Sequence, residues 1–202
     1  MSGIFSEREW VSGIFRDCSG LEGVSLSGLG IVDEKPFVDT KSGFEFGLFK
    51  DEEGLIVAFR GTGGNGVLSD WITNIKQALG FPIEQFNLAV SLANQVSAAI
   101  PTGSSLLFVG HSLGGGLASA AALATHRHAV TFNASGLSSG TIKRFDLDPS
   151  RANGLITAFH TAGDILTFLQ DATPLPGAVG ARVTLAPTQL ATPIGYHLQV
   201  PQ

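Results

Sequence analysis

Short apolar runs recur along the chain and predict buried strands. Two of them, residues 55–59 and 106–109, are continuous, and two more buried-strand candidates, residues 129–132 and 155–159, contain one threonine each. Continuous apolar runs of this length are typical of strands covered on both faces. Residues 44–48 alternate apolar and polar positions, which also predicts a strand. Residues 182–185 come before a proline-containing tail, so we expect a strand at the sheet edge there.

Helical patterns separate these strands. One apolar face ends at Pro101 and consists of Phe86, Ala89, Val90, Ala93, Val96 and Ile100. Ser6 and Glu9 form a capping box that predicts an N-terminal helix, and we expect further helices at residues 70–79 and 117–125. Strands that alternate with helices predict an α/β fold with a mostly parallel central sheet and helices on both faces. Because no repeat or linker interrupts the pattern, we expect one domain over residues 1–202.

Composition narrows the classes of partner. Charged residues make up 14% of the chain and apolar residues 44%, whereas about 25% charged residues is usual. This balance fits either a lipid-facing surface or a well-filled core. The net charge of −5, without a basic block, argues against nucleic acid and against polybasic membrane anchoring. The single cysteine, Cys18, is expected to be structural, on an apolar helix face.

The N-terminal residues show no pattern of a secretory signal peptide. No apolar run approaches the roughly 20 residues that a membrane span needs. We therefore expect a soluble protein, either in a bacterial cytoplasm or exported by a route that needs no signal peptide.

Residues 110–114 carry the strongest chemical signal, reading Gly110-His111-Ser112-Leu113-Gly114. This G-x-S-x-G motif lies between a predicted strand and a predicted helix, which is the context of the nucleophile elbow in the α/β-hydrolase fold. Glycine is needed at positions 110 and 114 where the strand and helix backbones crowd together. The motif predicts acyl-transfer chemistry, with Ser112 as the nucleophile and the N–H of Leu113 as an oxyanion donor.

A serine nucleophile needs a histidine base, and in this fold the histidine follows both the serine and the acid along the chain. His126 and His128 follow the elbow helix directly and are expected to be exposed. His160 precedes the acid candidate. We favour His197, in a late glycine-containing loop; the alternative is a surface histidine in a tail.

Asp164 is the favoured acid. It follows the strand at 155–159 after a tight turn, at the carboxyl edge where open α/β sheets build their sites. Asp146 and Asp148 lie in a charged, solvated stretch, and Asp171 fits a cap of the next turn. Because Asp146 and Asp148 lack the further ligands of a calcium loop, we expect neither a metal nor another cofactor.

Three blocks, residues 57–62, 70–75 and 110–115, resemble the fungal-type (class 3) lipases in order and spacing. The resemblance covers about residues 44–200, and residues 131–136 fall at that family's post-elbow strand and loop. It implies that Thr62 supplies a second oxyanion contact. It also implies a lid near residues 63–79 that includes Asp70 and Trp71, with a hinge in the glycine run 63–66. Core packing is the alternative for Trp71, and a tight loop is the alternative for the glycine run.

The chain is shorter than those lipases, and residues 133–137 look more like bacterial lipase-like proteins, some of which resemble secreted phospholipase effectors. We therefore expect a serine hydrolase of lipid esters, a lipase or phospholipase, in transient contact with membrane surfaces. An effector would also require a protein inhibitor in its producer. The alternatives are a soluble carboxylesterase or thioesterase, and a non-catalytic binding protein of the hydrolase fold.

Overall fold

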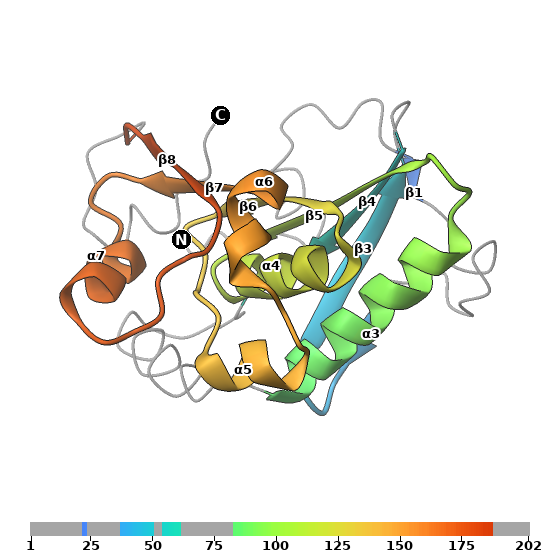
Figure 1. Ribbon diagram of the computed structural model, residues 1–202, viewed down its shortest axis with the longest axis horizontal. Coiled ribbons are helices and arrows are strands. Elements are labelled where there is room, and N and C mark those ends of the chain that lie inside the picture. Colours follow the sequence, from blue (N-terminus) through green and yellow to red (C-terminus); the bar gives the residue numbers. More distant parts are fainter. Residues whose placement is uncertain (1–21, 24–36, 51–53, 62–82, 188–202) are drawn as a thin grey trace, which may run out of the picture.

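The computed structural model describes residues 22–23, 37–50, 54–61 and 83–187 (Figure 1). Within these ranges one sheet contains eight strands. They are β1 (Glu22–Gly23), β2 (Phe37–Asp39), β3 (Phe44–Lys50), β4 (Gly54–Phe59), β5 (Ser105–His111), β6 (His128–Phe132), β7 (Ile156–Thr161) and β8 (Ala181–Leu185).

The strand order is β1-β3-β4-β5-β6-β7-β8, with β2 also paired to β3. Every neighbouring pair from β4 to β8 is parallel, whereas β3 is antiparallel to β1, β2 and β4. The carboxyl ends of β4 to β8 therefore lie at the same edge of the sheet. This mostly parallel arrangement confirms the predicted fold class.

Helices fill each crossover between the parallel strands, as parallel pairing requires. The described ones are α3 (Ile83–Ala99), α4 (Leu113–Thr125), α5 (Ser139–Arg144), the 3-10 helix η2 (Pro149–Arg151), α6 (Ala152–Leu155) and α7 (Ile165–Ala172). The pattern-based strands and the helix ending before Pro101 are confirmed. Two starts differ: α4 begins at Leu113 rather than 117, and β7 begins at Ile156 because Leu155 ends α6.

The main core lies between the sheet and the helices α3 and α4, which run side by side across it (Figure 1). Val57, Phe59 and Phe108 from the strands pack with Phe86 and Leu117 from these helices, and all five are almost fully buried. Strand neighbours point to opposite faces. The adjacent residues Ile56, Ala58 and Val109 are buried as well, so the central strands are covered on both sides.

Several predicted features lie outside the described residues: the capping box of Ser6 and Glu9, Cys18, and the helix at 70–79. Among the helices that are described, none is long and apolar enough to cross a membrane.

Candidate active site

Ser112 lies at the junction between β5 and α4, at the carboxyl edge of the sheet. Its backbone has φ 55° and ψ −123°, a conformation that side-chain-bearing residues rarely adopt. Its N–H donates to the carbonyl of Phe132 at 3.0 Å. Its own carbonyl accepts three N–H groups: Gly115 at 3.1 Å, Gly116 at 3.3 Å and Ser135 at 2.9 Å. The surrounding backbone therefore holds the serine in a strained turn, the geometry of a nucleophile elbow.

Two glycines make this turn possible. A β-carbon on Gly110 would lie 2.1 Å from the carbonyl oxygen of Gly114, and one on Gly114 would lie 2.2 Å from that of Phe59. Both distances are far below van der Waals contact, and both involve backbone atoms that cannot swing away. The first turn of α4 is thus packed directly on β4 and β5, as the motif predicted. His111, between Gly110 and the serine, is buried.

Backbone donors for an oxyanion can come from two segments beside Ser112. Leu113 is the first residue of α4, and the first N–H groups of a helix have no intrahelical acceptor. The second segment follows β4: a β-carbon on Gly61 would lie 2.7 Å from the carbonyl oxygen of His111 and 3.5 Å from Cβ of Ser112. Gly61 therefore passes directly alongside the serine. Thr62, the next residue, lies outside the described residues.

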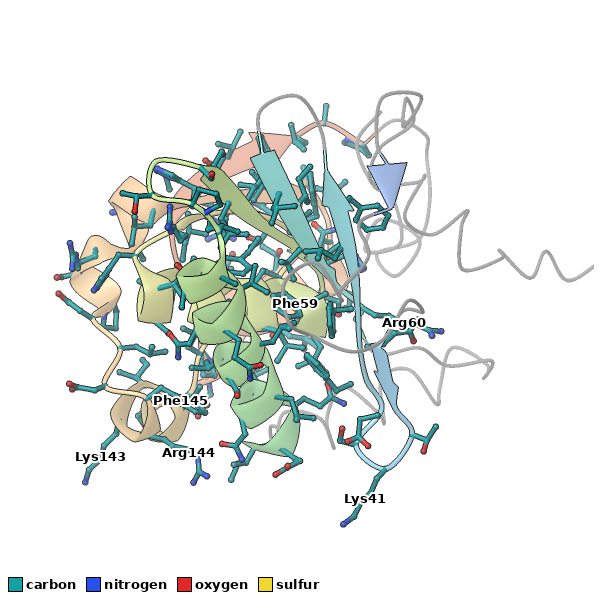
Figure 2. All side chains as sticks on the ribbon, turned by 90° about the vertical axis from the view of Figure 1, so that its right-hand side faces the viewer. Lys41, Phe59, Arg60, Lys143, Arg144 and Phe145 are labelled. Carbon is teal, nitrogen blue, oxygen red and sulfur yellow. The ribbon has the colours of Figure 1, made fainter. Side chains whose placement is uncertain are left out.

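An ion pair that the sequence did not predict supports the end of β4. The guanidinium of Arg60 bonds the carboxylate of Glu45, and the N–H of Arg60 donates to the carbonyl of Glu45 at 3.0 Å. The Glu45 side chain is only 11% exposed. Figure 2 shows Phe59 inside the molecule and Arg60 nearer its outer edge. This ion pair holds Arg60, the residue before Gly61, in place. The antiparallel register of β3 and β4 brings the pair together, because it sets Phe46 opposite Phe59 and so places Glu45 beside Arg60.

Asp164 lies at the carboxyl end of β7 and is 1% exposed. It caps α7, because its Oδ2 accepts the N–H of Thr167 at 2.6 Å. Its own N–H donates to the carbonyl of Thr161 at 3.0 Å, closing the turn after β7. Burying a carboxylate is costly unless other groups hydrogen-bond it, so Asp164 depends on partners such as the N–H of Thr167.

Ser112 and Asp164 follow strands that are two apart in the sheet, β5 and β7, with β6 between them. Neighbouring strands are about 4.8 Å apart, so the carboxyl ends of β5 and β7 are on the order of 10 Å apart at the same sheet edge. The third expected member, His197, lies outside the described residues, as do Asp70 and Trp71 of the expected lid.

The other candidate histidines and aspartates lie away from the Ser112 turn. His126 and His128 are exposed beyond α4, and Asp146 and Asp148 are exposed in the segment between α5 and η2. Hydrogen bonds from Ser150 lower the pKa of Asp148. These four side chains are therefore surface groups.

Asp171 does not cap a turn; its carboxylate receives two hydrogen bonds from Arg182 at 3.2 Å, which lower its pKa. His160 bonds Arg182 and Thr184 on β8. Across the part of the chain that is described, no three His, Cys, Asp or Glu side chains come together as metal ligands would.

Comparisons with known proteins identify the fold and the family of this chain. A crystal structure of a triacylglycerol lipase from Penicillium expansum superposes with a TM-score of 0.53, covering 88% of this chain and 76% of the lipase, at 17% identity. At that identity the match shows a shared α/β-hydrolase fold. The extracellular phospholipase A1 of Serratia liquefaciens is 41% identical over 176 residues, or 84% of this chain and 53% of the relative. The chain thus spans about half the length of that relative.

Residues 19–197 match the Tle-like phospholipase domain. This match extends over most of the chain and includes both the Ser112 turn and Asp164. The chain belongs to the family of Tle-like phospholipase domains.

Proposed function

We propose that this chain is a serine hydrolase of lipid esters, and that phospholipids are among its substrates. The observation that carries the proposal is the strained backbone of Ser112, held at the junction of β5 and α4. The family match and the name of the Serratia relative support a phospholipid rather than a soluble ester. The low fraction of charged residues, 14%, fits a protein that works at a lipid surface.

The proposed mechanism begins with proton transfer from the Ser112 hydroxyl to His197 as Oγ attacks the ester carbonyl. The tetrahedral oxyanion accepts hydrogen bonds from the N–H groups of Leu113 and Thr62. His197 then donates its proton to the departing alcohol oxygen, which leaves an acyl-enzyme. Water attacks this ester with His197 again acting as base, and the fatty acid and free Ser112 are regenerated.

Asp164 orients His197 in this proposal and balances the charge of the imidazolium that forms. Its fixed hydrogen bond to Thr167 suits this role, because it limits rotation of the carboxylate. The mechanism requires no cofactor. A lid that includes Asp70 and Trp71, transient contact with membrane surfaces, export from the cell and an inhibitor protein remain proposals. The name of the extracellular Serratia relative supports export.

The test uses purified protein and its Ser112→Ala variant on phospholipid vesicles, triacylglycerol emulsions and soluble short-chain esters. Mass spectrometry of fatty acids and lysolipids identifies both the substrate and the bond that is cleaved. We expect Ser112-dependent fatty-acid release from phospholipid, lowered at least about 10³-fold by the substitution.

Other outcomes separate the alternatives. Release from soluble esters alone would indicate a carboxylesterase. Equal activity of Ser112→Ala and wild type would exclude the proposed nucleophile. The absence of turnover on all three substrate classes would favour a binding protein with the hydrolase fold.

A further inference from the structure

Asn133 lies in a turn between the proposed nucleophile and the proposed acid, and this turn is hydrogen-bonded to the segments that carry both. Asn133 directly follows β6, the strand between β5 and β7, and is 2% exposed. Its φ is 43°, in the left-handed region that asparagine tolerates better than most residues. A buried polar side chain in an uncommon backbone conformation needs specific partners to persist.

On the nucleophile side, the turn around Asn133 holds Ser112 through Phe132 and Ser135. The carbonyl of Phe132 accepts the N–H of Ser112 at 3.0 Å, and the N–H of Ser135 donates to the carbonyl of Ser112 at 2.9 Å. Both polar groups of the Ser112 backbone are thus bonded to the turn that contains Asn133. A change in the path of this turn moves the elbow with it.

On the acid side, Asn133 bonds β7 twice. Its N–H donates to the carbonyl of Phe159 at 2.8 Å, and its side-chain Oδ1 accepts the N–H of Thr161 at 2.8 Å. The carbonyl of Thr161 in turn accepts the N–H of Asp164 at 3.0 Å. A continuous series of hydrogen bonds therefore runs from Ser112 through the Asn133 turn to Asp164.

We propose that Asn133 is a positioning residue that fixes the spacing between Ser112 and Asp164, through its side-chain bond to the N–H of Thr161. The proposal rests on the proposed function. Catalytic groups must be held close to their productive geometry. The side-chain oxygen of Asn133 gives the end of β7 a buried hydrogen-bond acceptor on the turn that follows β6.

The test compares Asn133→Gly with wild type. Glycine adopts the left-handed conformation without strain, so the substitution removes the side-chain acceptor and leaves the backbone path available. The readouts are the rate of covalent labelling by a fluorophosphonate probe, and kcat and KM on a soluble short-chain ester. All are measured at a temperature where circular dichroism shows each variant folded.

The matched control is Leu123→Ala. Leu123 is 3% exposed and lies near the far end of α4, about 16 Å along the helix from Ser112. The substitution lowers the melting temperature without touching the Asn133 turn. We expect Asn133→Gly to label and turn over at least tenfold more slowly than this control, with KM changed less than twofold. Labelling and kcat equal to those of Leu123→Ala would overturn the proposal.

If Asn133→Gly does not fold, Asn133→Asp and Asn133→Ala are compared with each other. Aspartate keeps the acceptor for the N–H of Thr161, whereas alanine removes it. We expect Asn133→Ala to label at least tenfold more slowly than Asn133→Asp. Equal labelling rates of these two variants would overturn the proposal. If the fluorophosphonate probe does not label Ser112 in the wild-type protein, the proposed function itself is refuted, before any Asn133 variant is compared.

Discussion

The main-chain N–H of Ser112 donates to the carbonyl oxygen of Phe132 at 3.0 Å, and this bond ties a residue with φ 55° to the neighbouring strand. Such a conformation costs about 1–3 kcal/mol in a residue with a side chain, and glycine avoids most of that cost. We expect Ser112→Gly to be more stable than Ser112→Ala by about 1 kcal/mol. Urea denaturation measures the difference. Equal stability would show that the turn is not strained.

A close contact between α4 and β4 gives a second prediction. A β-carbon on Gly114 would lie 2.2 Å from the carbonyl oxygen of Phe59, whereas one on Gly154 in α6 would meet nothing within 4 Å. We expect Gly114→Ala to lower the free energy of unfolding by at least about 2 kcal/mol. Gly154→Ala is the control and should raise it by about 0.5–1 kcal/mol. Similar stabilities of the two variants would contradict the described packing of the elbow.

Gly61 tests the segment proposed to carry the second oxyanion donor. Alanine there would place its β-carbon 2.7 Å from the carbonyl oxygen of His111, so the backbone must move away from Ser112. Losing one oxyanion donor typically costs about 10²–10³ in kcat. We expect Gly61→Ala to lose at least tenfold in kcat while KM changes little. Wild-type turnover in this variant would place the donor elsewhere, and Gly154→Ala again serves as the control.

His160 predicts a pH dependence of stability. Burial and the nearby Arg182 guanidinium lower its pKa below the usual 6.5, against the opposing effect of the Asp164 and Asp171 carboxylates. Nδ1 accepts from Arg182 at 3.4 Å, which leaves the Nε2 proton for Thr184 Oγ1 at 2.8 Å. Protonation of Nδ1 would break the first of these bonds. The folded protein therefore binds this proton less tightly than the unfolded chain does.

The sign of the effect follows from that difference. From pH 6.5 down to the lowered pKa, the unfolded state binds more protons, so stability falls as the pH falls. We expect the melting temperature of wild type to drop more steeply than that of His160→Gln between about pH 7 and pH 5. Parallel curves for the two proteins would contradict the lowered pKa.

Much of the fold follows from patterns of apolar residues. The apolar runs in β4 and β5 are continuous because the central parts of these strands are buried on both faces, and Pro101 marks the end of α3. The start of α4 was predicted too late, at 117 instead of 113. Glycines at 114–116 have low helix propensity, yet they form the first turn of α4. Glycine occupies these positions because neighbouring backbone and the side chains of Ala134 and Ser135 leave no room for a β-carbon.

The candidate site was predicted from local motifs, and the interactions that the sequence did not reveal are non-local. The G-x-S-x-G spacing led to the Ser112 turn, and the tight turn after 155–159 led to Asp164. Asn133 had no signal of its own, because its importance depends on β6 lying between β5 and β7. The pairing of Arg60 with Glu45 likewise depends on the register of β3 and β4.

The proposed triad of Ser112, His197 and Asp164 is tested most directly by the site of covalent labelling with a fluorophosphonate probe. Peptide mass spectrometry locates the label on wild type, Ser112→Ala, Asp164→Asn and His197→Ala. We expect a single modified residue, Ser112, in wild type. We expect no modification in Ser112→Ala, and labelling at least about 10²-fold slower in the other two variants. Labelling at a different residue, or wild-type labelling of Ser112 in His197→Ala, would contradict the proposed triad.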